Sequence, residues 1–419
     1  MKLSWYREFD GRQRSAFWAC FGGWALDAMD VQMYALVIPT LLAEWSLSKA
    51  QAGSLGTVAL LASSLGGIVA GHFADRIGRV RVLQITILWF SAFTFLSGLA
   101  QNYEQMFAAR TLQGFGFGGE WAAGAVLIAE LIPAKNRGRT IAAVSSGWSV
   151  GYGAAALLFS LLFHVFEPQV AWRVMFFIGI APSTLIFFVR RNVPESDIYA
   201  SERARIARAE RPRMIDIFRA KLGARTMLAW AVCLGVLGGN YTVLTWLPTY
   251  LQTERHLSYS NTGLYLLVNI LGSFLGYILG GDVSDRMGRP GSLKLFAVIG
   301  TASVISYLLF AASPLAILLM GFPLGFAQSA MNAGLAPLLS ELYPTRLRAT
   351  GQGFCYNAGR GVGALFPTLV GFFAGAAGLT VAISAAAACA YALVLACAFA
   401  LPETRDRQLS KIDPAGNSQ

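Results

Sequence analysis

Long apolar segments separated by short polar breaks form the hydrophobic pattern of this 419-residue chain. Most are about 20 residues or longer, the length that a helix needs to cross the hydrocarbon core of a bilayer. Because backbone groups in lipid need partners within the protein, and the pattern lacks the alternation of a membrane barrel, the segments are predicted to be helices. We expect an all-α membrane protein with twelve transmembrane helices, at 17–42, 51–74, 82–101, 104–132, 140–163, 172–190, 226–252, 260–283, 292–312, 314–341, 350–374 and 377–401.

Motifs in the first half of the chain recur in the second half. The sequence GHFADRIGR begins at Gly71, and GDVSDRMGR begins 210 residues later, at Gly281. The motif Pro-Glu-Ser at Pro194 likewise corresponds to Pro-Glu-Thr at Pro402. Parallel repeats of six helices, related by an axis along the membrane normal, are a known transporter architecture with the substrate site near the midplane, between the repeats. The repeat therefore predicts two pseudo-symmetric six-helix bundles.

The repeat and the polar segments set the expected domain boundaries. We expect an amino-terminal six-helix bundle at 1–190, a cytoplasmic linker at 191–225, and a carboxyl-terminal six-helix bundle with its tail at 226–419. The linker is polar and rich in arginine. It is interpreted either as a solvated tether or as an amphipathic helix on the anionic inner leaflet.

Composition and charge support a membrane protein and argue against a nucleic-acid partner. The chain is 55% hydrophobic and 13% charged, with a mean hydropathy of +0.54. Its net charge of +11 comes mostly from alternate loops, because the odd-numbered loops hold only Lys49, Arg173 and Arg255. By the positive-inside rule, the pattern predicts a multi-pass protein of the cell inner membrane with both termini in the cytoplasm.

Histidines and cysteines give no sign of a metal site, a cofactor or an enzyme. The residues His72, His164 and His256 lie near membrane boundaries and are not grouped as metal ligands. The five cysteines lie in apolar segments without the close pairing of a metal or redox motif. The first apolar span is too long for a cleavable signal sequence, so we expect it to be the first membrane helix.

Five charged residues lie well inside the predicted membrane helices, away from their ends: Asp27, Asp30, Arg110, Glu120 and Arg360. Each costs at least about 2.5 kcal/mol at the bilayer centre, so each is a functional hypothesis. Asp27 and Asp30 share one helical face, and two neighbouring carboxylates favour the binding of a proton. Glu120 lies about 15 Å along its helix from Arg110, too far for direct pairing.

We predict that Asp27, Asp30, Glu120 and Arg110 take part in proton coupling. Two alternatives remain for the aspartates: a helix-to-helix hydrogen bond, or a permanent ion pair with Arg110. Glu120 is expected to meet the first helix or to face the central cavity.

Arg360 is the best candidate for binding an anion. A guanidinium keeps its charge and binds a carboxylate through two parallel hydrogen bonds. The alternative is a structural ion pair with another helix. Aromatic and amide residues on the presumed cavity helices complete the predicted substrate site with Arg360: Asn357, Tyr356, Asn240, Tyr241, Trp148, Gln32 and Tyr34.

The segments that begin at Gly71 and Gly281 resemble the loop signature of the major facilitator superfamily, and the resemblance extends over essentially the whole chain. It implies a transporter that works by alternating access. The charged residues of the signature would then control the conformational change: Asp75, Arg76, Arg79, Asp285, Arg286 and Arg289. A purely topological role for the arginines is the alternative.

Further segments resemble the sialate and monocarboxylate proton symporters, namely WALDAMD at Trp24, GGE at Gly118, WRVMFFIG at Trp172 and RNVPE at Arg191. The related aromatic-acid proton symporters also carry a paired aspartate in the first helix. The resemblance implies symport of a small organic anion with protons, by a monomer in the lipid bilayer. Competing hypotheses are an aromatic-acid symporter, a proton-coupled efflux antiporter, and a non-transporting sensor or membrane enzyme.

Overall fold

The computed structural model describes residues 4–131, 140–141, 143–184, 214–311, 313–344 and 347–404. Within these ranges it does not describe the side chains at 4–5, 71–72, 74–76, 79, 119–131, 182–183, 214, 220–221 and 349. The chain divides into two compact units. Unit 1 comprises Met1–Ala209 and His256–Leu264, and unit 2 comprises Glu210–Arg255 and Tyr265–Gln419.

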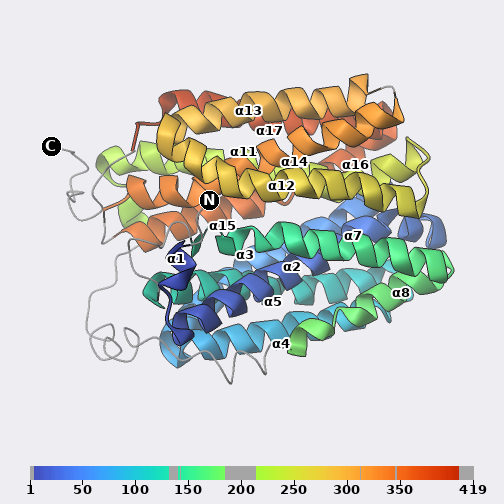
Figure 1. The fold of residues 1–419 in the computed structure, drawn as a ribbon, viewed down its shortest axis with the longest axis horizontal. Coiled ribbons are helices and arrows are strands. Elements are labelled where there is room, and N and C mark those ends of the chain that lie inside the picture. The colour runs from blue at the N-terminus through green and yellow to red at the C-terminus, as the bar shows by residue number, and fades with distance from the viewer. Residues whose placement is uncertain are drawn as a thin grey trace. The chain divides into compact units, whose positions relative to one another are not determined.

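All regular secondary structure in the described residues is helical, as Figure 1 shows. Apart from the start of α12, unit 1 contains α1 (Ser4–Arg7), α2 (Gly11–Glu44), α3 (Lys49–Ile77), α4 (Arg79–Ser97), α5 (Tyr103–Leu131), α7 (Gly147–Val165), α8 (Pro168–Ile178) and the 3₁₀ turn η1 (Ala181–Thr184). The remaining elements are η2 (Met214–Phe218), α11 (Ala220–Thr253), α12 (Tyr259–Met287), α13 (Arg289–Ile305), the π-helical turn η3 (Ser306–Phe310), α14 (Pro314–Leu342), α15 (Arg348–Gly363), α16 (Phe366–Ala377) and α17 (Leu379–Ala400).

The predicted all-α membrane fold is confirmed. Ten helices of the described part of the chain are long and apolar enough to cross a membrane. The other two predicted spans correspond to α5 and to α8 with η1, and residues 185–190 of the latter lie outside the described residues. The chain is therefore a multi-pass membrane protein.

Two of the differences between predicted and observed helix boundaries have local chemical reasons. Helix α2 begins six residues before the predicted span, because Asp10 and Gln13 form a reciprocal capping box at its start. The predicted eleventh span, 350–374, is divided into α15 and α16. Pro367 lies at the start of α16, where its missing N–H and its ring end the helical hydrogen bonding from α15.

The repeated motif forms the same turn in both units. Gly78, between α3 and α4, has a φ of 108°, and Gly288, between α12 and α13, has a φ of 85°. Both values lie in the region that favours glycine over residues with a side chain. The two copies of the motif thus share backbone conformation as well as sequence.

Small residues bring the helices that carry the functional residues close together. In unit 1, a Cβ atom at Gly147 would lie 2.8 Å from the Phe21 carbonyl oxygen, and one at Gly151 would overlap the Ala25 backbone. The contact moves four residues along α7, from Gly147 to Gly151, as it moves four residues along α2, from Phe21 to Ala25. Helices α2 and α7 therefore run parallel to each other. In unit 2, Gly359 and Gly363 of α15 meet α11 in the same way. Such close backbone contacts are typical of membrane helices.

Candidate functional site

A buried arginine organises the polar interior of unit 1. The Arg110 side chain, on α5, is 2% exposed, and its Nη1 donates a hydrogen bond to Gln113 Oε1 at 2.6 Å. The same Nη1 lies 3.9 Å from Asp30 Oδ2 on α2, so this ion pair is looser than the bond to the amide. The guanidinium also lies over the Tyr34 ring, 4.7 Å from its centroid. A cation over an aromatic face is stabilised electrostatically.

Three further hydrogen bonds hold this arrangement in place. Gln113 Nε2 donates to Thr94 Oγ1 on α4 at 2.9 Å, and Thr94 Oγ1 donates to the Phe90 carbonyl at 2.8 Å. The Tyr34 hydroxyl donates to the Ala52 carbonyl on α3. We call Asp30, Tyr34, Thr94, Arg110 and Gln113 the Arg110 cluster. Its buried side chains come from α2, α4 and α5, and Tyr34 connects them to the backbone of α3.

The structure brings Asp30 and Arg110 together, and it places Tyr34, which was predicted to bind substrate, beside Arg110. Gln113 and Thr94 are members that sequence reasoning missed. Gln113 is three residues after Arg110 and therefore on the same helical face, a spacing that could have identified it. Asp27 is fully buried one turn before Asp30. The side chain of Glu120 lies outside the described residues.

Aromatic side chains line the contact between α2 and α7. The rings of Trp24 and Trp148 lie 5.2 Å apart at an interplanar angle of 49°. One turn after Trp148, Tyr152 is 1% exposed, and its hydroxyl makes no hydrogen bond within the described residues. The same holds for the amide nitrogen of Gln32, which is also 1% exposed. Buried polar groups of this kind cost free energy unless something satisfies them, so they are candidates for ligand contact.

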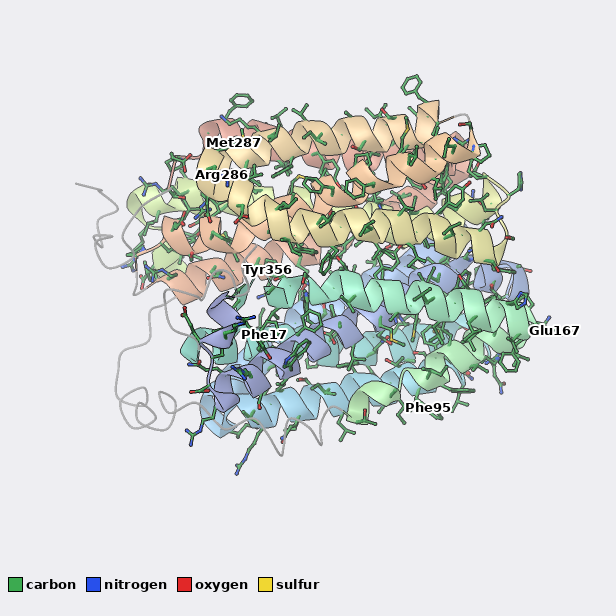
Figure 2. All side chains as sticks on the ribbon, viewed as in Figure 1. Phe17, Phe95, Glu167, Arg286, Met287 and Tyr356 are labelled. Carbon is green, nitrogen blue, oxygen red and sulfur yellow. The ribbon has the colours of Figure 1, made fainter. Side chains whose placement is uncertain are left out.

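A second buried arginine organises unit 2. Arg360 on α15 is 2% exposed, and its side chain shares a hydrogen bond with the Tyr241 hydroxyl of α11. Tyr356, one turn before Arg360 and labelled in Figure 2, interacts electrostatically with both. Tyr277 of α12 interacts with the two tyrosines and hydrogen-bonds to Ser329. We call Tyr241, Tyr277, Tyr356 and Arg360 the Arg360 cluster.

Neighbouring polar residues extend this region of unit 2. Gln328 Nε2 donates to the Tyr391 hydroxyl at 3.1 Å, and that hydroxyl donates to Asn240 Oδ1 at 3.4 Å. The predicted residue Asn357 uses its amide nitrogen within α15, donating to the Gly353 carbonyl at 3.0 Å. Tyr277 was not predicted, because a tyrosine at one helical position of an apolar span has no sequence signal of its own.

Equivalent positions in the two units carry different side chains. Trp148 follows Gly147, which contacts α2, and Arg360 follows Gly359, which contacts α11. The fifth helix of each bundle thus presents an indole in unit 1 and a guanidinium in unit 2 at the same register. The two units are therefore specialised differently.

Arg289 forms the centre of a charged network at the end of unit 2. Its Nε and Nη2 donate to the two Glu341 oxygens at 3.0 and 2.8 Å, and its Nη1 pairs with Asp285 at 2.6 Å. Glu403 accepts a hydrogen bond from the Arg289 backbone at 3.1 Å, and Thr404 donates one to Glu341 at 2.7 Å. Glu341, in the last turn of α14, and Glu403, near the chain end, are thus partners of the motif.

The remaining predicted gating residues differ in what the structure shows of them. Arg286 is exposed on α12 and labelled in Figure 2. The side chains of Asp75, Arg76 and Arg79 lie outside the described residues. The Asp285–Arg289 pair is therefore the part of the predicted gate that can be built from described contacts.

The sequence of the chain is similar to those of known membrane transporters. The family model described as the Major Facilitator Superfamily matches residues 20–367. A probable 4-methylmuconolactone transporter of Cupriavidus pinatubonensis is 40% identical over 99% of this chain and 96% of its own length. A cis,cis-muconate transport protein of Acinetobacter baylyi is 32% identical, covering 89% of this chain and 91% of the relative. A sialic acid transporter of Escherichia coli is 29% identical, with coverages of 91% and 93%.

The fold agrees with that of a solved transporter structure. The crystal structure of a D-xylose-proton symporter superposes with a TM-score of 0.75 at 18% identity, covering 95% of this chain and 100% of the other. The relatives are named as transporters, which confirms that the chain is not an enzyme. The predicted resemblance is likewise confirmed, and the chain belongs to the Major Facilitator Superfamily.

Proposed function

We propose that the protein is a secondary transporter that carries a small organic anion together with a proton across the cell inner membrane. The observation that supports the anion most strongly is the Arg360 cluster. A buried guanidinium with three tyrosines around it offers a permanent charge, hydroxyl groups and apolar ring surface. A carboxylate bound by such a guanidinium is held through two parallel hydrogen bonds, which fix its orientation.

The substrate that fits this cluster best is a planar unsaturated or aromatic carboxylate. Tyrosine rings give extended apolar contact at little cost in side-chain entropy, and they suit flat molecules. Two relatives carry muconate or a muconolactone by name, which favours the same class. The second candidate is a sialate or another aliphatic acid, favoured by the sialic acid transporter among the relatives.

Proton coupling is assigned to Asp30 in the Arg110 cluster. At 3.9 Å, the ion pair with Arg110 is near the limit of direct pairing, and Asp30 Oδ1 makes no hydrogen bond within the described residues. A buried carboxylate with such loose compensation gains stability by binding a proton, and a neutral carboxyl no longer attracts Arg110. We assign supporting roles to Asp27 and Glu120.

Gating is assigned to the charged network of Arg289. The two-pronged contact between Arg289 and Glu341 ties the start of α13 to the end of α14. We propose that the network stabilises one conformation and breaks in the other, and that Asp75, Arg76 and Arg79 act alike in unit 1. The distribution of Lys and Arg supports cytoplasmic termini. We further propose a cytoplasmic linker at 191–225 between bundles at 1–190 and 226–419, and a monomer as the working unit.

Purified protein in proteoliposomes tests this function. An imposed inward proton gradient should drive uphill uptake of at least one radiolabelled acid from a panel of benzoate, muconate, lactate and sialate. Arg360→Gln keeps a polar side chain at that position and should abolish uptake. The absence of uphill uptake for every acid, with folded protein in the vesicles, would contradict the proposal. Uptake driven by an outward gradient would indicate an antiporter.

A further inference from the structure

Gln113 stands between the two charged groups of the Arg110 cluster. Its Oε1 accepts a hydrogen bond from Arg110 Nη1 at 2.6 Å, and the same Nη1 lies 3.9 Å from Asp30 Oδ2. The amide therefore binds the guanidinium nitrogen that lies nearest to Asp30. Since a charge-assisted hydrogen bond is strongest below about 3 Å, Asp30 receives only part of the available stabilisation.

The amide is itself fixed in one orientation. Gln113 Nε2 donates to Thr94 Oγ1 at 2.9 Å, so the amide oxygen must face Arg110. The side chains of Gln113 and Thr94 are 2% and 0% exposed, which excludes competition from water. Thr94 is also hydrogen-bonded to its own helix and interacts with the Asp30 side chain through a hydrogen bond. The position of the guanidinium is thus set by an amide anchored on a neighbouring helix.

We propose that Gln113 is a positioning residue that sets the pH at which Asp30 exchanges its proton. It does so by holding Arg110 away from the carboxylate. The inference rests on the proposed function, in which Asp30 carries the proton. The consequence is that Asp30 exchanges its proton at a higher pH than it would if the guanidinium were in full contact.

Other groups near Asp30 do not offer the same control. Among the described residues, Arg110 is the charged side chain within ion-pair distance of Asp30. The remaining titratable side chains on α2 from Asp27 onward, and at the same level on the described parts of the helices packed against it, are Asp27, Tyr34, Glu44, Lys49, Tyr103, Glu104, Tyr152, His164 and Arg173. These side chains are the same in every variant below, because each of the two Gln113 variants changes Gln113 alone.

Two substitutions of similar size should shift the pH dependence in opposite directions. Gln113→Met removes the acceptor, so the guanidinium closes on Asp30, the ionised carboxylate is stabilised, and a lower pH is needed to protonate it. Gln113→Glu binds Arg110 more strongly and places a negative charge near Asp30, so protonation occurs at a higher pH. If the distance between Arg110 and Asp30 falls from 3.9 Å to direct contact, the pH at which Asp30 binds its proton should fall by about one unit, at an effective dielectric constant of about 20.

The experiment measures the initial rate of gradient-driven uptake against pH in proteoliposomes. The half-maximal pH should fall by about one unit in Gln113→Met and rise by about one unit in Gln113→Glu. Thr111→Val is the matched control, because the Thr111 hydroxyl bonds to the Phe107 carbonyl within α5, outside the cluster. Its profile should match that of the unchanged protein.

The outcomes separate this inference from the proposed function. A lower rate with an unshifted profile in both variants, or a shift of both in the same direction, would show that Gln113 is only structural. Asp30→Asn provides the second arm, measured by counterflow and by gradient-driven uptake. If Asp30→Asn still accumulates substrate against its gradient, the proton assignment itself is wrong. If accumulation is lost while counterflow remains and the Gln113 profiles do not move, only the role of Gln113 is overturned.

Discussion

The charged network around Arg289 makes a quantitative prediction about which of its contacts stabilises unit 2. Arg289 pairs with Glu341, whose side chain is 13% exposed, and with Asp285, whose side chain is 67% exposed. Solvent screens the second pair strongly, so its contribution should lie within about 0.2–1 kcal/mol although its distance is the shorter. Removing one partner of a mostly buried pair leaves an uncompensated charge and costs about 3–5 kcal/mol.

Glu341→Gln should therefore destabilise the protein far more than Asp285→Asn. For a unit of about 200 residues, each kcal/mol lowers the unfolding midpoint by about 2–4 °C. Thermal unfolding of the purified protein should thus show a loss of at least about 6 °C for Glu341→Gln and at most about 4 °C for Asp285→Asn.

The control for this prediction is Arg286→Gln, which changes an exposed arginine of the same motif and should alter the midpoint by no more than a surface substitution does. Equal losses for the two acidic substitutions, or a larger loss for Asp285→Asn, would refute the reasoning from burial.

Three further predictions concern single side chains. Arg360→Lys keeps the charge but loses the two-pronged geometry, so the KM for the transported acid should rise about tenfold or more, while circular dichroism of the helices stays unchanged. Tyr152→Phe removes a buried hydroxyl that makes no hydrogen bond within the described residues, so thermal stability should hold or increase, and a rise in KM would identify the hydroxyl as a substrate contact. Gly151→Val places side-chain atoms against the Ala25 backbone, so the yield of folded protein on size-exclusion chromatography should fall sharply, whereas Gly11→Ala, with open space at its Cβ, should not reduce it.

The fold could be predicted from the sequence because membrane helices carry long, separate signals. Apolar length and loop charge each report on one segment at a time, and the copies at Gly71 and Gly281 relate the two halves directly. The ends of the helices were harder to predict. The capping box of Asp10 and the break before Pro367 depend on local backbone bonding that hydropathy does not contain.

The charged residues are the part of the candidate site that the sequence indicated most clearly. Arg110, Asp30 and Arg360 stand out because an ionisable residue in an apolar helix is expensive. Gln113, Thr94 and Tyr277 carry no such signal, since amides, hydroxyls and phenols occur in many membrane helices. Their roles depend on which helices pack together. The spacing of residues along the sequence indicates which side chains are neighbours within one helix, but not which helices are in contact.

The central claim is that substrate and proton move together, and proton movement driven by substrate tests it most directly. Proteoliposomes with a pH-sensitive dye inside receive a sudden outside excess of the transported acid, with a protonophore and protein-free vesicles as controls. We predict internal acidification that requires the protein and is lost in Asp30→Asn, although Asp30→Asn still performs counterflow. Substrate entry at the same rate without any protein-dependent acidification would contradict proton symport.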